Sequence, residues 1–115
     1  MATISLPSGR NIDVIATVNA SLPQQVEIVG PGIEHKWEGS GEGKRIGQAA
    51  ISIPPGVEDV KVEVKVSYSP EEGSWSPSHE KVTEEREIGE IHVIAEDGRG
   101  ALDGNDLIVR FRWVA

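Results

Sequence analysis

The chain has 115 residues, no cysteine, and a formal net charge of −8 with a pI of about 4.8. The length fits a single domain, and a hydrophobic content of 37% is enough for a modest core. The absence of cysteine excludes disulfides and thiolate metal sites, and the negative charge disfavours nucleic acid as a partner, because such binding depends on lysine and arginine at phosphates.

No segment of the sequence has the features of a leader or a membrane span. The N-terminal residues lack the basic start and apolar run of a signal peptide. No apolar run is long enough to cross a bilayer, so we expect no membrane insertion. Without a leader, the protein is expected in the cytoplasm or outside the cell by non-classical export.

Hydrophobic and polar residues alternate along most of the chain, with the period of two that is typical of half-buried strands. An edge strand is expected at Ser5-Leu6-Pro7, and no helix is expected anywhere. In chain order, the other expected strands cover residues 12–18, 26–29, 36–38, 49–53, 60–68, 91–95 and 107–114. The pattern predicts one domain, residues 1–115, folded as an all-β antiparallel sandwich of about eight or nine strands.

The segments between these runs contain only weak motifs. Residues 39–44, GSGEGK, share glycines with a phosphate-binding loop, but the spacing is wrong and Arg45 replaces the Mg²⁺-binding Ser or Thr, so we expect a hairpin turn. Residues 71–78 are the least regular and are expected to form a protruding loop. The three histidines are dispersed, without a nucleophile or base beside them, so no catalytic site is predicted.

Carboxylate and amide side chains concentrate in the glycine-rich stretch 96–106, EDGRGALDGND. Ca²⁺ takes about six to eight oxygen ligands, which a short loop supplies well when side chains of this type recur at close spacing. Glu96 and Asp97 stand at the start of the stretch, and Asp103, Asn105 and Asp106 at its end. The same residue types are also ordinary turn formers, so the alternative interpretation is a solvated hairpin turn.

This stretch resembles the C-terminal motif of the bacterial two-calcium fucose/mannose-binding lectins, the calcium-mediated lectins. The shared pattern is EDG, a short spacer, D-x-N-D and a final strand that ends in Trp113. Other matching segments occur in the same order along the chain: Ser5-Leu6-Pro7, a strand ending at Asn19, Trp37-Glu38-Gly39-Ser40, Ile46-Gly47 and the alternating run 60–66. The resemblance covers nearly the whole chain.

The resemblance implies a lectin that binds mannose- or fucose-type monosaccharides through one or two calcium ions per chain. The implied metal ligands are the backbone oxygen of Asn19, the side chains of Glu96, Asp103, Asn105 and Asp106, and the terminal carboxylate of Ala115, supplied to the partner chain of a homodimer. The implied sugar-binding residues are Ala20, Ser21, Leu22 and Asp97, together with Asp103 and Asp106, which would bridge the ions. An apolar residue at position 20 implies a preference for mannose over fucose.

The homodimer is also expected from the last strand, whose pattern suggests an exposed edge that would invite pairing. Residues 107–114 are apolar on one face and carry Arg110 and Arg112 on the other. We therefore expect the two copies to join partly through this strand.

Two departures from the family pattern keep other functions open. Ala101 stands where the family has a further Asp, and the chain is one residue shorter after Trp113, with Val114 in place of Pro. The alternative function is a non-catalytic β-sandwich interaction module whose calcium site is structural or absent. A glycosidase is not expected, because it needs two carboxylates about 5–10 Å apart, one of them protonated, and calcium ligands stay ionised.

Overall fold

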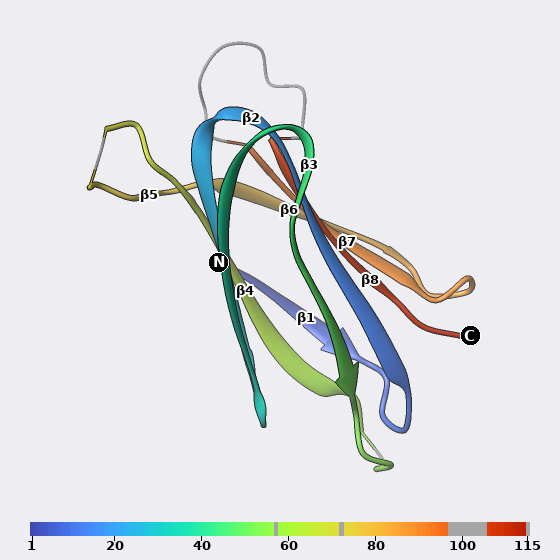
Figure 1. Cartoon of the computed structure of the whole chain (residues 1–115). Coiled ribbons are helices and arrows are strands. Elements are labelled where there is room, and N and C mark those ends of the chain that lie inside the picture. Colours follow the sequence, from blue (N-terminus) through green and yellow to red (C-terminus); the bar gives the residue numbers. More distant parts are fainter. Residues whose placement is uncertain (57, 72, 97–105, 115) are drawn as a thin grey trace.

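The computed structural model describes residues 1–56, 58–71, 73–96 and 106–114, and in this part of the chain every regular element is a strand. The strands are β1 (Ala2–Leu6), β2 (Asn11–Gly30), β3 (Ile33–Ser52), β4 (Val60–Tyr68), β5 (Ser76–Pro77), β6 (His79–Glu85), β7 (Glu90–Glu96) and β8 (Leu107–Arg112) (Figure 1). All pairings are antiparallel, in the order β1-β4-β2-β8-β7-β6, with β3 on β2 and β5 on β4. The predicted all-β antiparallel sandwich is confirmed. The described residues include no helix suited to spanning a membrane.

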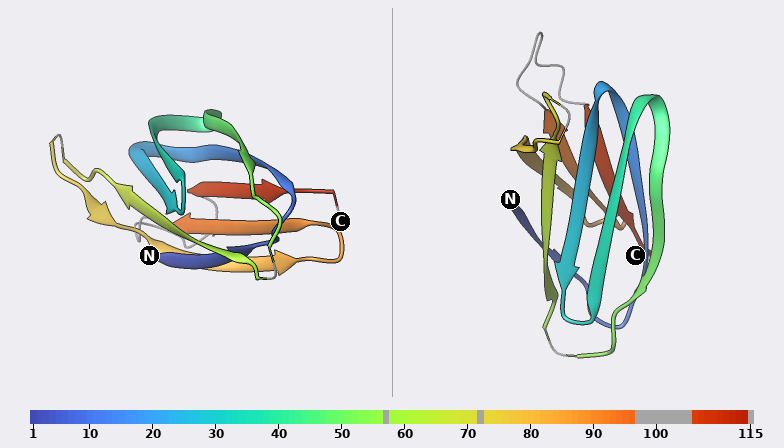
Figure 2. Two further views of the ribbon diagram at one scale, coloured as in Figure 1. Left: turned by 90° about the horizontal axis from the view of Figure 1, so that it is seen from below. Right: turned by 60° about the vertical axis from the view of Figure 1, so that its left-hand side comes forward.

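The two long strands β2 and β3 connect the layers of the sandwich. Residues 24–29 of β2 pair with β4 in the first layer, whereas residues 13–18 pair with β8, which forms the second layer with β7 and β6. β3 follows β2 along its length, and three register shifts between Ala16 and Gln24 mark the place where the hairpin bends. Figures 1 and 2 show both strands curving at the same end of the molecule.

The sequence prediction was wrong about the number of separate elements here. The expected strands 12–18 and 26–29 are two halves of β2, and 36–38 and 49–53 both belong to β3. Residues 39–44, predicted as a hairpin turn, lie inside β3 at its bend, where Gly41 and Gly43 adopt φ values of 118° and 64°. A bend with shifted register interrupts the hydrophobic alternation as a turn does, so the sequence pattern cannot separate the two.

Inward-facing residues of both layers form one apolar core. The alternation predicted from sequence is confirmed on β4, where Val62, Val64 and Val66 are fully buried. On β8 the fully buried residues include Phe111, the largest side chain of the core. Phe111 lies opposite Val14 of β2 and Ile91 of β7.

A tryptophan joins the two halves of β3 across the bend. The indole of Trp37 lies so close to Gly47 that a Cβ at position 47 would come within 1.9 Å of the ring. Glycine is needed there because the side chain approaches the backbone, and not because a turn demands it. The His35 ring stacks on the same indole with centroids 5.4 Å apart. The bend of the hairpin is therefore fixed by packing on its inner side.

The last strand is not an edge. β8 pairs with β2 on one side and with β7 on the other, so the expected exposed edge at residues 107–114 is wrong. The alternation of a strand reports which side chains are buried, but not how many neighbours the backbone has. On the outer face of β8 the side chains of Ile108, Arg110 and Arg112 alternate with the buried ones.

Candidate functional site

Residues from opposite parts of the chain meet at the end of the sandwich where β2 and β3 bend. β7 ends there at Glu96, and β8 begins there at Leu107 (Figure 1). The backbone N–H of Asn19 donates a hydrogen bond of 2.9 Å to the carbonyl oxygen of Asp106. The structure thus places these two predicted metal ligands side by side.

Asn19 occupies an irregular position of β2. Its neighbours Val18 and Ala20 pair with Lys44 and Gly41, with a register shift between the two pairs. The backbone N–H of Gly43 donates a hydrogen bond of 2.8 Å to Asn19 Oδ1. This side chain therefore holds the bend of β3 against the bend of β2, beside Asp106.

Three of the predicted ligands lie on the outer face of the second layer. Val18, Ala95 and Leu107 are fully buried, so the adjacent residues Asn19, Glu96 and Asp106 occupy the outward positions of their strands. Because Ala95 pairs with Leu107, Glu96 and Asp106 stand at neighbouring strand ends. Two carboxylates and a backbone oxygen are hard donors, of the kind that Ca²⁺ takes in proteins.

The three residues predicted to tune sugar recognition follow Asn19 along the bend of β2. Ala20 is 9% exposed and faces the core, Ser21 is exposed, and Leu22 is half-buried. The fully buried Gln24 donates a hydrogen bond of 3.3 Å from Nε2 to the carbonyl oxygen of Leu22, and this contact from the core helps to fix the backbone of the segment. Of the three predicted residues, Ser21 offers its side chain most fully to a ligand.

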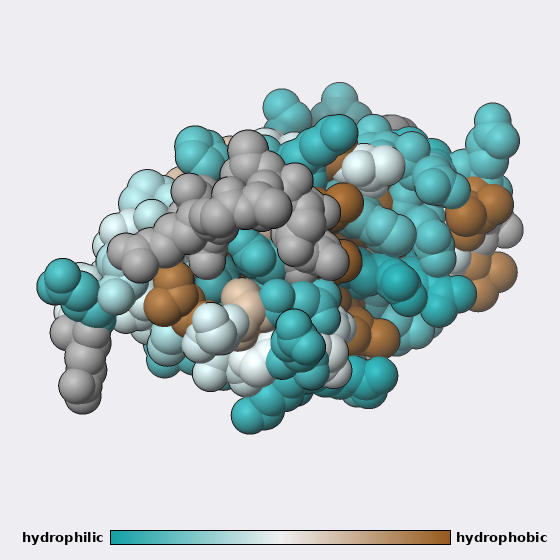
Figure 3. Space-filling model, turned by 90° about the horizontal axis from the view of Figure 1, so that it is seen from above, coloured by the Kyte–Doolittle hydropathy of each residue, from teal (hydrophilic) through white to brown (hydrophobic). Residues whose placement is uncertain are grey.

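The other predicted site residues lie outside the described residues: Asp97, Asp103, Asn105 and Ala115, together with the departing position Ala101. The described ranges by themselves contain no group of three or more His, Asp or Glu residues that could hold a metal ion. Seen from this end, the described surface is mostly hydrophilic (Figure 3). The described part of the site thus supplies a carbonyl from β2, a carboxylate from the end of β7 and a carboxylate from the residue before β8.

Sequence reasoning missed the contribution of the β3 bend to this site. Gly43 contacts Asn19 only because β2 and β3 bend together, and no periodic signal in residues 39–44 marks that position. The three register shifts are a property of the paired strands, so one strand read alone does not reveal them. In the sequence, the glycines at positions 41 and 43 are the residues that indicate an irregular backbone at this place.

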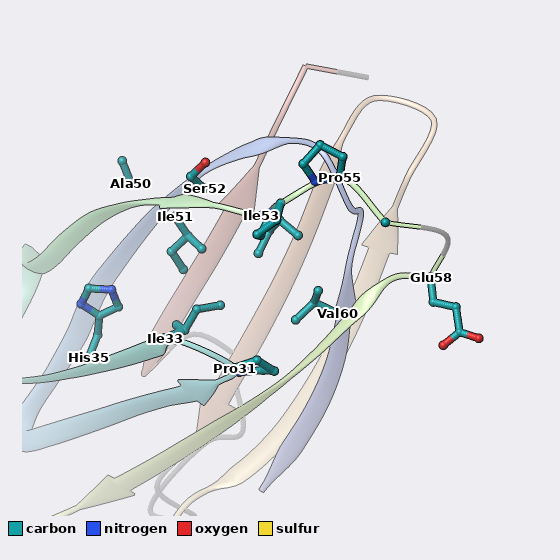
Figure 4. Close-up of a pocket in the computed structure, with 13 residues that line it drawn as sticks. Pro31, Ile33, His35, Ala50, Ile51, Ser52, Ile53, Pro55, Glu58 and Val60 are labelled. Carbon is teal, nitrogen blue, oxygen red and sulfur yellow. The ribbon is translucent and has the colours of Figure 1, made fainter.

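A larger hollow lies elsewhere, between the two ends of β3 and the segment that leads from β3 to β4. It has a volume of about 520 Å³, and Ile33, Ile51, Ile53 and Val60 are among the residues that line it (Figure 4). Its lining is mainly aliphatic, with His35 towards one end. This hollow offers no set of oxygen ligands and contains none of the predicted site residues.

Comparison with known proteins supports the resemblance found in the sequence. The family model of fucose-binding lectin II (PA-IIL) matches residues 4–115. Among solved structures, the lectin CV2L of Chromobacterium violaceum, in complex with alpha-methyl-fucoside, is 25% identical with a TM-score of 0.71. The match covers 98% of this chain and 96% of that one.

Two further structures share the fold. The high-affinity mannose-binding lectin of Ralstonia solanacearum is 23% identical, with a TM-score of 0.73 and coverage of 98% of this chain and 96% of that one. The C-terminal domain of the BC2L-C lectin from Burkholderia cenocepacia is 22% identical, with a TM-score of 0.68 and coverage of 98% and 95%. No curated protein matches the chain significantly. Since the family model spans nearly the whole sequence, this chain belongs to the fucose-binding lectin II family.

Proposed function

We propose that this protein is a calcium-dependent lectin that recognises mannose- and fucose-type monosaccharides through sugar hydroxyls coordinated directly to calcium. Family membership supports sugar binding, and two structural relatives are a fucoside complex and a mannose-binding lectin. The observation that carries the proposal is the hydrogen bond between Asn19 and Asp106, which brings two implied ligands together from distant parts of the chain.

The chain's own residues would hold the metal from three sides. The backbone oxygen of Asn19 and the carboxylates of Glu96 and Asp106 provide the described ligands, and Asp103 and Asn105 extend the set. Bound calcium would supply a concentrated positive charge at which sugar hydroxyls are effective ligands. The hydrogen bond from Gly43 to Asn19 Oδ1 fixes the orientation of this residue, so the position of its backbone oxygen is set before a ligand arrives.

We propose a binding role and not a catalytic one. A glycoside hydrolase uses one carboxylic acid to protonate the leaving oxygen. Carboxylates that coordinate calcium stay ionised and cannot donate that proton. The acidic residues gathered at this site are therefore suited to holding a cation and accepting hydrogen bonds from a sugar.

Calorimetric titration with methyl mannoside and methyl fucoside tests the proposal. With calcium, both sugars are expected to saturate the protein, the mannoside more tightly, and a chelator should abolish binding. Asp106→Ala should remove binding because it deletes an implied bridging ligand. The matched control is Asp13→Ala, which removes an exposed carboxylate near the start of β2, away from the bend that carries Asn19. This variant should bind both sugars normally.

Weak binding needs care in this assay, since a millimolar affinity corresponds to only about 4 kcal/mol. If neither sugar saturates at tens of millimolar while calcium is demonstrably bound, the lectin proposal fails. The interaction module with a structural calcium ion would then be the better description.

We also propose that the protein is a homodimer in which the terminal carboxylate at Ala115 reaches the calcium site of the partner subunit. The support for this dimer is the family resemblance. The last strand adds no support, since β8 pairs with β2 and β7 and offers no free edge to a partner. The expected result in sedimentation velocity is a dimer at micromolar concentration with calcium, shifted towards monomer by chelator, since a shared ligand links metal binding to association. A monomer under both conditions would contradict the shared site.

A further inference from the structure

A tryptophan lies exposed in the loop that connects β4 to β5. The described residues of this loop are 69–71 and 73–75, and Trp75, directly before β5, is 41% exposed. By contrast, Trp37 and Trp113 are partly buried and pack against the core. An exposed indole presents a flat apolar face with a polar N–H at its edge, so it suits a ligand that combines apolar and polar groups.

The loop leaves the sandwich beside the segment predicted to tune sugar recognition. The backbone N–H of Ser69 donates a hydrogen bond of 2.9 Å to the carbonyl oxygen of Pro23, which directly follows residues 20–22 on β2. Figures 1 and 2 show the β4–β5 loop and the bend of β2 at the same end of the molecule. The exposed tryptophan therefore belongs to the recognition end.

Hydrogen bonds within the loop hold its described backbone in place. The Oγ atoms of Ser69 and Ser74 donate hydrogen bonds of 2.7 and 3.1 Å to the same acceptor, the carbonyl oxygen of Glu71. The backbone N–H of Ser74 also donates to this oxygen, at 3.1 Å. Because Trp75 follows Ser74 directly, its backbone is positioned before a ligand arrives, and less conformational entropy is lost on binding.

The strand register sets the distance between Trp75 and the bend of β2. Ser76 lies opposite Tyr68, and Tyr68 lies opposite Gln24 of β2. Trp75, next to Ser76, therefore stands two strand spacings from β2, which is roughly 10 Å at about 4.8 Å per spacing. A single sugar ring at the candidate calcium site does not extend this far, whereas the second or third ring of a linked chain does.

The loop is separate from the face that the proposed dimer covers. It joins two strands of the first layer, whereas the terminal residue shared between the subunits follows β8 in the second layer. In Figure 1 the loop lies on the left of the molecule and the end of β8 on the right. The indole of Trp75 therefore stays accessible in the proposed dimer.

The surroundings of Trp75 suit a neutral sugar ring. The face of an aromatic ring carries the negative part of its quadrupole, which attracts the weakly positive C–H groups on one side of a pyranose. Glu71 is exposed in the same loop, and the chain has a net charge of −8, so an acidic sugar would be repelled here.

We propose that Trp75 forms a second subsite, on which the second or third ring of a neutral oligosaccharide stacks while its terminal ring is held at the candidate calcium site. This inference rests on the proposed function and narrows its substrate class from monosaccharides to chains of neutral sugars. Trp75 sets the preference for chain length and linkage, and it leaves the affinity for a monosaccharide unchanged.

Calorimetry in the presence of calcium compares methyl mannoside with three mannotrioses that differ in linkage. The wild type should bind at least one mannotriose about five- to tenfold more tightly than the monosaccharide, as one aromatic stacking contact allows. Trp75→Ala should remove most of this gain and keep the affinity for methyl mannoside, which also shows that the variant is folded. Trp75→Phe retains an aromatic face and should keep most of the gain.

The matched control is Ile88→Ala, which removes an exposed apolar side chain from the turn between β6 and β7, at the other end of these strands from Glu96. It should keep the full gain. A wild type without any gain, a gain that survives in Trp75→Ala, or an equal loss in Ile88→Ala would overturn the proposal. A change in the sedimentation of Trp75→Ala would do so too, because the indole would then be a contact between copies.

Failure of the proposed function gives a different result. If methyl mannoside does not bind with calcium, the nuclear magnetic resonance of the Trp75 indole N–H, identified by its loss in Trp75→Phe, decides the fate of the subsite. Movement of this signal with added mannotriose, while the signals of Trp37 and Trp113 stay in place, would support the subsite by itself. No movement would overturn it.

Discussion

Phe111→Ala is expected to lower the free energy of unfolding by about 3–5 kcal/mol, the range for truncating a large aromatic residue in a packed core. Phe111 is fully buried in the middle of the second layer, opposite Val14 and Ile91 on the strands to either side. The neighbouring backbones are fixed by ladder hydrogen bonds, so the core cannot close around the missing ring. Since small domains have only about 5–15 kcal/mol of stability, the variant should be close to unfolding.

Urea denaturation followed by far-UV circular dichroism measures this loss. The control is Val114→Ala, because Val114 is 86% exposed and should change the stability by less than about 0.5 kcal/mol. A loss below about 1 kcal/mol for Phe111→Ala would contradict the packing described for β8.

Calcium is expected to raise the free energy of unfolding by about 2.7 kcal/mol when its concentration is a hundred times the dissociation constant. The reason is that the site requires Asn19 and Asp106 to be adjacent, and only the folded chain brings them together. An unfolded chain has no such arrangement of oxygen ligands, so calcium binds the native state. A chelator should reverse the whole effect.

Thermal melting with calcium, magnesium and chelator measures this second effect. Asp106→Ala and Asp103→Ala should each remove most of the calcium shift, whereas Asp13→Ala should keep it. Magnesium should shift the melt less, because it demands a small octahedral site and retains its waters. A melt that ignores both calcium and chelator would rule out the metal site and leave the interaction module without calcium.

The sequence predicts the inner and outer faces of β4 and β8 correctly, because a strand turns each side chain to the opposite face of its neighbour. The same reasoning fails at β2 and β3. Each strand continues through the bend with a shifted register, but its hydrophobic pattern breaks there, at residues 20–25 of β2 and 39–44 of β3, so each strand resembles two. It also fails to identify β8 as an inner strand, because pairing partners leave no mark on a single strand.

The candidate site shows the corresponding limit. Composition indicates an oxygen-rich loop at 96–106, but nothing in spacing connects that loop to Asn19. Only the family resemblance links them, and the structure adds their hydrogen bond and the role of Gly43. Position 20 illustrates a further limit, because Ala20 faces the core and any effect on sugar preference must act through packing.

The bent hairpin of β2 and β3 also determines the order in which the protein can assemble. Its ladder starts beside the tight turn at Pro31 and Gly32, where closing the chain costs little entropy, and it can zip outward pair by pair. The contact between Asn19 and Asp106 instead closes a loop of most of the chain, which is slow and costly. We therefore expect β2 to pair with β8 after the hairpin has formed, and a ligand held at both Asn19 and Asp106 would slow the separation of these two strands.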